Sequence, residues 1–364
     1  MADYIDQIKV NNNGPYPVIG VSGDRYYGGV NLGTKFATEI AAAPYSGDVW
    51  AWIKARIQAG NFAGIHVNDY IQWTSTNGRV VKSCVGGIDT YYKYGDTAVG
   101  HHIDFISRDL WPTTTTMNPV NFNNGVIPVE TRSGDGTTTA FILTKTMAGI
   151  STITIGGVAT TDYTYNSTTF TVTFTTAPAS GTNNIVVTGT GSEHPWLASN
   201  AYAFLNSLQT HVPNSTGANP AIVQVDYTST GVYNFIPTAL KNVIVEKRLY
   251  IPKRYSASEV ITTDNAGGWT NVGKLWLPFE MEITGCQVWG DIKYGLMGMV
   301  QYPIFANNMN RLKGLGDGGS RNNWWSASAV AGYTTYCVIV GTCGSVAYTG
   351  ASTSHGAPVC FRIS

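Results

Sequence analysis

Histidines and acids come closest together in one short stretch, where His101, His102 and Asp104 stand within four residues. Imidazole and carboxylate groups can together ligate a metal ion or carry out general acid–base chemistry. On a strand, however, adjacent histidines point to opposite faces, so His101 and His102 can enter one site only where the chain bends. No H-E-x-x-H or comparable spacing accompanies them. The stretch therefore favours a structural role over a catalytic or metal-binding one.

The other acids and the cysteines form no recognisable catalytic pattern. Glu280, Glu282 and Asp291 are spread among apolar residues, and the two carboxylates of a glycosidase meet only in three dimensions. The sequence neither favours nor excludes that chemistry. The odd number of cysteines argues against a full disulfide framework, and no C-x-x-C pair is present. The five are Cys84, Cys286, Cys337, Cys343 and Cys360. We expect no catalytic residues, no metal, no cofactor and no enzymatic activity.

Three segments have the apolar spacing of helices. In residues 48–59 the apolar side chains recur every three or four positions, Ser46 or Asp48 can cap the start, and Gly60 can end the helix. Residues 195–208 show a similar spacing after Pro195. A third, shorter helix is expected over residues 237–244.

Alternating apolar residues predict many short strands. They are expected over residues 65–67, 70–73, 79–85 and 88–92, and again around 245–249, 275–277 and 286–289. The pair Gly86-Gly87 is expected to separate two of these strands. Near the C-terminus, residues 336–340 and 345–348 predict a β-hairpin with a turn at Gly341–Gly344. Cys337 and Cys343 would face each other across that turn, as buried reduced thiols or as an oxidisable pair.

Residues 131–191 differ in composition from the rest of the chain. Of these 61 residues 20 are Thr, and only four are charged. Five or six alternating segments divided by turns predict a small β-sandwich. The segments on either side read as parts of one domain, so the sandwich is expected to be an insertion at a surface loop.

The composition excludes several classes of protein. With 22 basic and 22 acidic residues and only 12% charged residues, the chain lacks the basic surface expected for nucleic-acid binding. A hydrophobic fraction of 43% excludes disorder as a description of the whole. No run reaches the roughly 18 apolar residues of a membrane span, and the first residues are unlike a secretory signal. We expect a folded protein made in a cytoplasm, with no membrane insertion.

The C-terminal residues carry a resemblance to a known family. Trp324-Trp325-Ser326-Ala327-Ser328, followed by an ending with Cys360-Phe361-Arg362, resembles a C-terminal domain of phage and bacterial proteins. That domain is similar to the C-type-lectin-like fold of formylglycine-generating enzymes and of variable proteins diversified by retroelements. The copper-site cysteine pair of those enzymes has no match here. The Thr-rich segment similarly resembles immunoglobulin-like sandwiches inserted into phage fibre and decoration proteins.

This resemblance implies an α+β, mostly β fold, in which a C-type-lectin-like domain is interrupted by an immunoglobulin-like β-sandwich. The implied organisation is an extended N-terminal arm or anchor over residues 1–45, the first part of the lectin-like domain over 46–130, the inserted sandwich over 131–191, and the second part over 192–364. The loop-rich arm is expected to lie against a neighbouring subunit or the particle.

The function implied is that of a bacteriophage virion protein that displays the lectin-like domain for adhesion to a host surface glycan or protein. The binding face would be residues 324–355. Its anchors are expected to be the polar-tipped rings among small neighbours, Tyr333, Tyr336, Tyr348 and His355, whereas Trp324 and Trp325 belong to the core. A Ser- and Thr-rich strand surface without any ligand is an open alternative.

Two other functions remain open: capsid or tail decoration without ligand binding, and, as the weakest, an enzyme. The expected partners are other virion proteins, with the chain as a homo-oligomer. The sequence does not distinguish head from tail fibre.

Overall fold

The computed structural model describes residues 28–93, 98–117, 129–143, 149–166, 171–190, 196–197, 199–213, 222–252, 267–290, 299–330 and 336–364. It is mostly β, with 38% strand and 18% helix arranged around several antiparallel sheets. The expectation of a mostly β fold is therefore confirmed. None of the helices within the described ranges has the length and apolar character that a membrane crossing requires.

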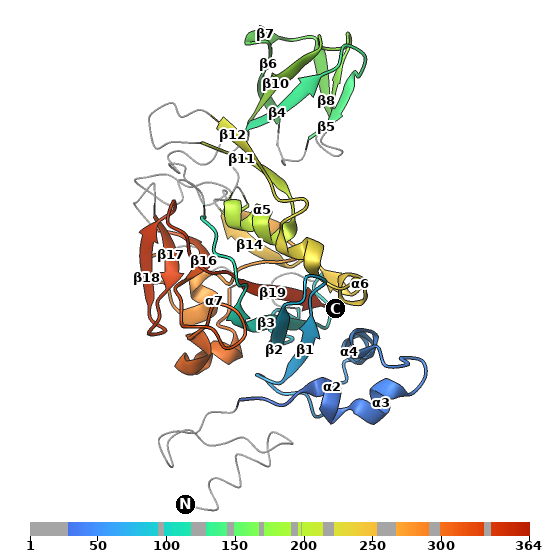
Figure 1. Cartoon of the computed structure of the whole chain (residues 1–364), viewed down its shortest axis with the longest axis vertical. Helices are drawn as coiled ribbons and strands as arrows, with labels where there is room; N and C mark the ends of the chain where they lie inside the picture. Colours follow the sequence, from blue (N-terminus) through green and yellow to red (C-terminus); the bar gives the residue numbers. More distant parts are fainter. Residues whose placement is uncertain are drawn as a thin grey trace, which may run out of the picture.

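We call the described residues outside 129–190 the main body. A five-stranded antiparallel sheet lies at its centre (Figure 1). Its strands run in the order β1 (Tyr70–Thr74), β2 (Val80–Ile88), β3 (Ile103–Leu110), β19 (Pro358–Ile363) and β13 (Ile244–Val245). The last strand of the chain thus pairs with β3, with Phe361 opposite Phe105. Residues before and after the Thr-rich segment share this sheet and one hydrophobic core.

Three helices lie beside this sheet (Figure 1): α2 (Leu32–Lys35), α3 (Ala37–Ala41) and α4 (Val49–Gln58). The prediction for residues 48–59 is confirmed. The Asp48 carboxylate accepts hydrogen bonds from the backbone N–H groups of Trp50 and Ala51, which caps the helix. Gly60 follows it with φ +61°, a conformation that favours glycine. Trp50 packs edge-on against Phe361.

The N-terminal arm was predicted to extend to residue 45, and this boundary is wrong. Residues 28–45 include α2 and α3, and Leu32 and Ile40 belong to the main core. Asn31 caps α2 and also bridges to Tyr70 of β1. Residues 1–27 of the predicted arm lie outside the described residues.

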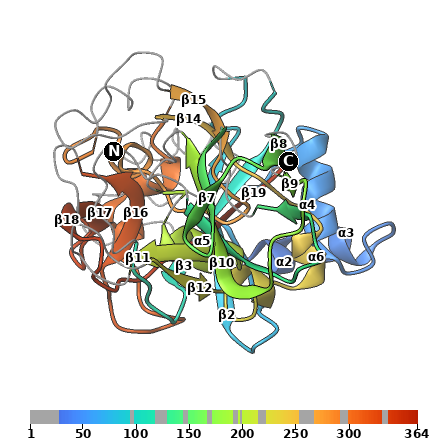
Figure 2. The ribbon, with the colours of Figure 1, turned by 90° about the horizontal axis from the view of Figure 1, so that it is seen from above.

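A second sheet lies on the opposite side of the main body from α2, α3 and α4 (Figures 1 and 2). It has the order β16 (Trp324–Ala329), β17 (Tyr336–Val340) and β18 (Val346–Gly350). The predicted C-terminal hairpin is confirmed, because β17 and β18 pair in register with Val340 opposite Val346. Gly344 in its turn has φ +81°.

The remaining elements of the main body are short. Two hairpins are formed by β11 (Gln209–Pro213) with β12 (Ile222–Asp226), and by β14 (Arg248–Pro252) with β15 (Gly267–Asn271). The helices are α5 (Asn200–Asn206), α6 (Thr238–Lys241), α7 (Glu280–Thr284), and the 3-10 helices η1 (Val232–Phe235), η2 (Pro303–Ala306) and η3 (Asn308–Arg311). The helix expected over residues 195–208 is shorter than predicted, because Ser199 caps it and Trp196 instead enters the core.

The Thr-rich segment forms two antiparallel sheets around a core of its own. One has the order β4 (Val129–Gly134), β10 (Gly181–Thr190), β6 (Gly149–Ile155) and β7 (Val158–Thr160); the other has the order β5 (Ala140–Ile142), β9 (Thr171–Phe174) and β8 (Tyr163–Asn166). Their shared core contains Leu143, Ile153, Val172, Phe174, Ile185 and Val187. These residues form a cluster separate from the main core, and Figure 1 shows the two sheets at one end of the molecule.

Several strand predictions differ from the structure. Residues 65–67, 275–277 and 286–289 form no strand, and residues 89–92 form a turn after β2. Gly86 and Gly87 do not separate two strands but lie inside β2, where the register with β3 shifts. A Cβ atom on Gly87 would lie 2.1 Å from Thr90 Oγ1 and 3.1 Å from Tyr302. Close packing, rather than a turn, therefore requires glycine there.

Candidate functional site

The hairpin β17–β18 brings two of the predicted anchor residues together. Tyr348 lies opposite Val338, and Tyr336 is two residues from Val338 on the same face. The Tyr336 and Tyr348 ring centres are 5.5 Å apart and nearly perpendicular. Tyr348 has 37% of its surface exposed. These rings form a partly accessible aromatic pair on the hairpin.

Trp289 completes this pair and was not predicted. Its ring centre lies 4.6 Å from that of Tyr348 in an edge-on arrangement, and the Trp289 side chain is half-buried. We call Trp289, Tyr336 and Tyr348 the aromatic cluster. No sequence signal pairs Trp289 with Tyr348, because the two residues are far apart in the chain and Trp289 lies in an irregular segment.

A buried carboxylate holds the backbone beside Trp289. Glu280, at the start of α7, accepts hydrogen bonds from the N–H groups of Trp289 and Gly290, at 3.1 and 2.7 Å. Its own N–H donates to the Ser328 hydroxyl on β16. Burial raises the pKa of Glu280, although these backbone hydrogen bonds act in the opposite direction. Glu280 thus ties α7, β16 and the aromatic cluster together.

Of the other two predicted anchors, His355 does not join this cluster. Tyr333 lies outside the described residues. His355 packs edge-on against Trp325, with ring centres 4.8 Å apart, and its backbone forms two hydrogen bonds with Thr115. Burial lowers the pKa of His355. His355 is therefore held by packing against Trp325 and by backbone pairing with Thr115. The indole N–H of Trp325 donates to the Thr115 carbonyl as well.

The predicted binding face, residues 324–355, is only partly accessible. All six residues of β16 are buried, including Trp324 and Trp325 at 0% exposure, so their assignment to the core is confirmed. Four of the five residues of β17 are buried as well. Among the described residues of the segment, the accessible ones lie in β18 and its flanking turns, and the extent of the predicted face is corrected accordingly.

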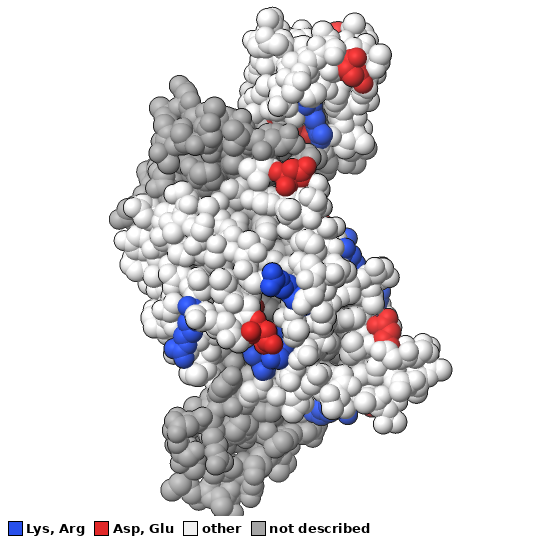
Figure 3. All heavy atoms as spheres, in the orientation of Figure 1, with Lys and Arg blue, Asp and Glu red and all other residues white. Residues whose placement is uncertain are grey.

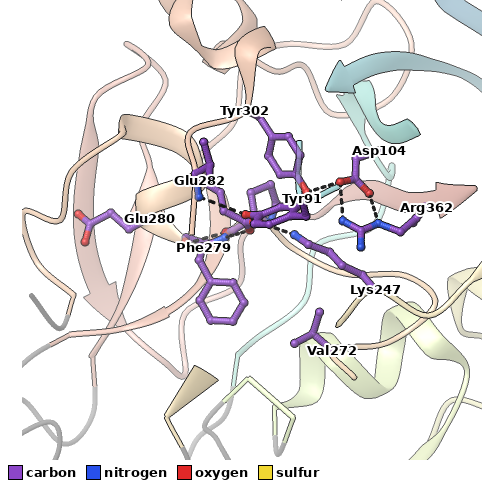
Figure 4. Close-up of polar contacts among 12 residues, drawn as sticks. Tyr91, Asp104, Lys247, Val272, Phe279, Glu280, Glu282, Tyr302 and Arg362 are labelled. Atoms are coloured by element: carbon purple, nitrogen blue, oxygen red, sulfur yellow. Dashed lines mark hydrogen bonds and ion pairs between the residues drawn. The ribbon is translucent and has the colours of Figure 1, made fainter. Parts of the chain in front are cut away.

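A second group of polar residues forms an ionic network inside the main core (Figure 4). Asp104 on β3 and Arg362 on β19 are joined by two hydrogen bonds of 2.8 Å. The Tyr302 hydroxyl donates to the same carboxylate at 2.8 Å. Asp104 has 0% exposure and Arg362 has 3%. This pair connects the C-terminal strand to the strand beside it through charge as well as through backbone pairing.

Glu282 and Lys247 form the other half of the network. The Lys247 ammonium donates to Glu282 at 2.5 Å and lies 3.7 Å from the centre of the Trp276 ring. Glu282 also accepts hydrogen bonds from the Tyr91 hydroxyl and from the N–H of Phe279. Glu282 and Lys247 have 0% exposure. Figure 4 shows Glu280 pointing away from this network, so Glu280 and Glu282 do not face a common substrate position.

The electrostatics of the Asp104–Arg362 pair keep both of its groups charged. Burial raises the pKa of Asp104, but the adjacent Arg362 outweighs it and lowers the value to about 2. Burial would lower the pKa of Arg362, and Asp104 reverses this effect. Burial also raises the pKa of Tyr302 well above its usual value. Since these groups form hydrogen bonds and ion pairs with one another and are shielded from solvent, the network has a structural role, and we call it a clamp because it joins β3 to β19.

The two adjacent histidines lie just before β3 rather than on a strand, and they enter different surroundings. His101 is partly exposed, stacks on Tyr92 at 4.1 Å, and its Nδ1 lies 2.6 Å from the Asp89 carboxylate. His102 is buried, with Nδ1 2.8 Å from the Gly100 carbonyl, and burial lowers its pKa. Within the described ranges no group of three or more His, Cys, Asp and Glu residues is placed to hold a metal ion.

The predicted proximity of Cys337 and Cys343 is wrong. Cys337 of β17 lies opposite Thr349 of β18 and is fully buried, whereas Cys343 is exposed in the turn. Burial raises the pKa of Cys337, and hydrogen bonding with Ser345 lowers that of Cys343. All five cysteines are free thiols. The hairpin register therefore separates the two residues that the sequence appeared to pair.

Comparison with known proteins found no relative: no family model, no curated protein and no solved structure matches the chain.

Proposed function

We propose that the chain is a bacteriophage virion protein that attaches the particle to a glycan or protein on the host surface. In this proposal the main body is the lectin-like domain and the Thr-rich sandwich is its immunoglobulin-like insertion. The observation that carries the adhesive role is the aromatic cluster: Tyr348, with 37% of its surface exposed, contacts both Tyr336 and Trp289.

Such a cluster suits recognition because of its rigidity. Tyr and Trp rings supply large contact areas with few rotatable bonds, and their polar tips can form hydrogen bonds. Tyr336 and Tyr348 are fixed by strand pairing, and Trp289 by the hydrogen bonds of its backbone to Glu280. A surface ordered before binding avoids part of the entropy cost of association. The same apolar faces can contact either the C–H face of a sugar or an apolar patch of a protein.

The virion location is tested on purified particles. Particles banded by density gradient and analysed by mass spectrometry should contain the chain in many copies. Finding the chain in the lysate of infected cells but not in particles would contradict the proposal. This measurement does not depend on the aromatic cluster.

Decoration of the capsid or tail without ligand binding is the alternative. An adhesin and a decoration protein would both be found in particles, so a binding assay is needed to distinguish the two functions. The full chain, labelled with a fluorophore, is titrated onto host cells and onto cells that the phage does not infect. Saturable binding to host cells alone supports adhesion. Equal or absent binding to both supports decoration.

A further inference from the structure

A cleft of about 430 Å³ opens on the main body, and its lining shares no residue with the aromatic cluster or the ionic network. It is bordered by the start of β2, by the end of β3 and by the loop of residues 314–319. Its volume is in the range of small-ligand sites. Figure 3 shows few charged side chains on the face drawn there, with acidic and basic groups side by side over the region of β2 and β3.

The loop of residues 314–319 is held firmly against β3. Leu110 donates its N–H to the Gly314 carbonyl at 2.8 Å, and its carbonyl accepts from the Gly316 N–H at 3.0 Å. Gly316 and Gly318 have φ angles of +78° and +72°, and a Cβ atom on Gly319 would lie 2.0 Å from the Leu315 carbonyl oxygen. Glycines at these positions therefore permit a tight loop, and the cleft wall is formed in advance of any ligand.

Two acids and two bases line the cleft. Lys82 and Asp317 form an ion pair of 2.8 Å across it, with side chains 24% and 40% exposed. Asp109 is half-buried and accepts a hydrogen bond of 3.3 Å from the Gly314 N–H. Arg79 is exposed, and its guanidinium has no hydrogen-bonding or ionic partner within the described part of the chain. The charges of the four groups cancel.

This set of groups selects the chemistry of a ligand. A net-charged ligand finds no excess of opposite charge, whereas a hydroxyl group can donate to a carboxylate and accept from a guanidinium or ammonium. Leu110, Pro112 and Leu315 add an apolar part to the lining, suited to the C–H face of a sugar ring. We propose that the cleft binds one unit of a neutral saccharide, with Asp109 and Arg79 as the principal polar contacts.

The proposal is independent of virion adhesion, because it concerns binding of a free sugar to the isolated full chain. The probes are the methyl glycosides of glucose, galactose and N-acetylglucosamine, with glucuronic acid and glucosamine as charged counterparts. Saturation-transfer NMR at millimolar concentrations is expected to show binding of at least one neutral glycoside and weaker binding of both charged sugars. No transfer to any neutral glycoside, or tighter binding of a charged sugar, would overturn the proposal.

Two substitutions locate the binding. Asp109→Asn and Arg79→Ala are each expected to weaken it by about tenfold, the usual effect of losing a hydrogen bond to a charged group. The control, Asp162→Ala, removes an exposed acid of the sandwich and should leave affinity unchanged. Tryptophan fluorescence checks that each variant is folded. If Asp109→Asn unfolds, the Arg79→Ala variant, which changes an exposed side chain, tests the location of the site alone. Unchanged affinity in the folded variants would place the sugar elsewhere and refute the assignment.

Discussion

Replacing Asp104 with Asn should destabilise the main body far more than an equivalent change at the surface. Asn keeps the shape of the side chain but leaves the guanidinium of Arg362, 3% exposed, without a counter-charge. It also weakens the two hydrogen bonds of 2.8 Å that join β3 to β19. Removing one partner from a buried ion pair costs about 3–5 kcal/mol. We expect a loss of that size in the free energy of unfolding.

The assay follows from the distribution of tryptophans. The chain contains 10 Trp, and none lies between residues 129 and 190, so tryptophan fluorescence in urea reports on the main body alone. The matched control is Asp317→Asn, which breaks the partly exposed pair with Lys82 and should cost less than about 1 kcal/mol. A loss in Asp104→Asn no greater than that of the control would refute the clamp.

The same comparison has a defined pH dependence. The folded pKa of Asp104 is about 2, below the ordinary value of 3.8. A depressed carboxyl pKa stabilises the fold above the unfolded pKa, and this contribution is lost as the pH falls towards the folded pKa; here it amounts to about 2 kcal/mol. The stability difference between wild type and Asp104→Asn should therefore shrink by that amount between about pH 5 and pH 2. A constant difference would contradict the assigned shift.

Three further predictions concern other parts of the chain. Deleting residues 131–191 with a short Gly-Ser bridge should leave a cooperative tryptophan-fluorescence transition, because the two cores are separate; loss of that transition would show that the main body needs the sandwich. With a thiol reagent on the folded chain, exposed Cys286 and Cys343 should react quickly and buried Cys84, Cys337 and Cys360 only after unfolding; equal rates for Cys337 and Cys343 would contradict the hairpin register. Asp48→Ala should lower stability by about 1 kcal/mol through loss of the α4 cap, with Asp48→Asn as the near-neutral control; equal losses in both variants would point to a role of the charge beyond capping.

Features decided by neighbouring residues were predictable from the sequence. Asp48, the apolar spacing that follows and Gly60 lie within one short segment, so their pattern fixed α4. The alternation on either side of Gly341–Gly344 predicted the hairpin for the same reason. The shift in composition at the Thr-rich segment indicated a region with a core of its own.

Features decided by contacts across the chain were not predictable. Asp104 meets Arg362 across 258 positions, and Tyr91 meets Glu282 across 191, so no local pattern marks the ionic network. Gly87 reads as a turn residue, although the reason for glycine is its closeness to Thr90 and Tyr302.

The candidate site shows the same division. The choice of Tyr336 and Tyr348 followed from their type and their place on a predicted hairpin, and the register then put them together. His355 had the same polar-tipped character, but its position depends on packing against Trp325. Trp289 could not be chosen, because its contact with Tyr348 depends on how Glu280 holds its backbone.

The adhesive role is tested most directly by measuring how tightly the full chain with Tyr336→Ala and Tyr348→Ala binds host cells. The loss of these two anchors, the exposed Tyr348 and the half-buried Tyr336, should weaken binding by more than about tenfold, or 1.4 kcal/mol, without changing the unfolding midpoint by fluorescence. The matched control is Tyr250→Ala, which removes one ring of the edge-on pair with Trp269 on the β14–β15 hairpin and should bind as wild type does. If the folded double variant binds host cells as tightly as this control, the aromatic cluster is not the adhesive surface.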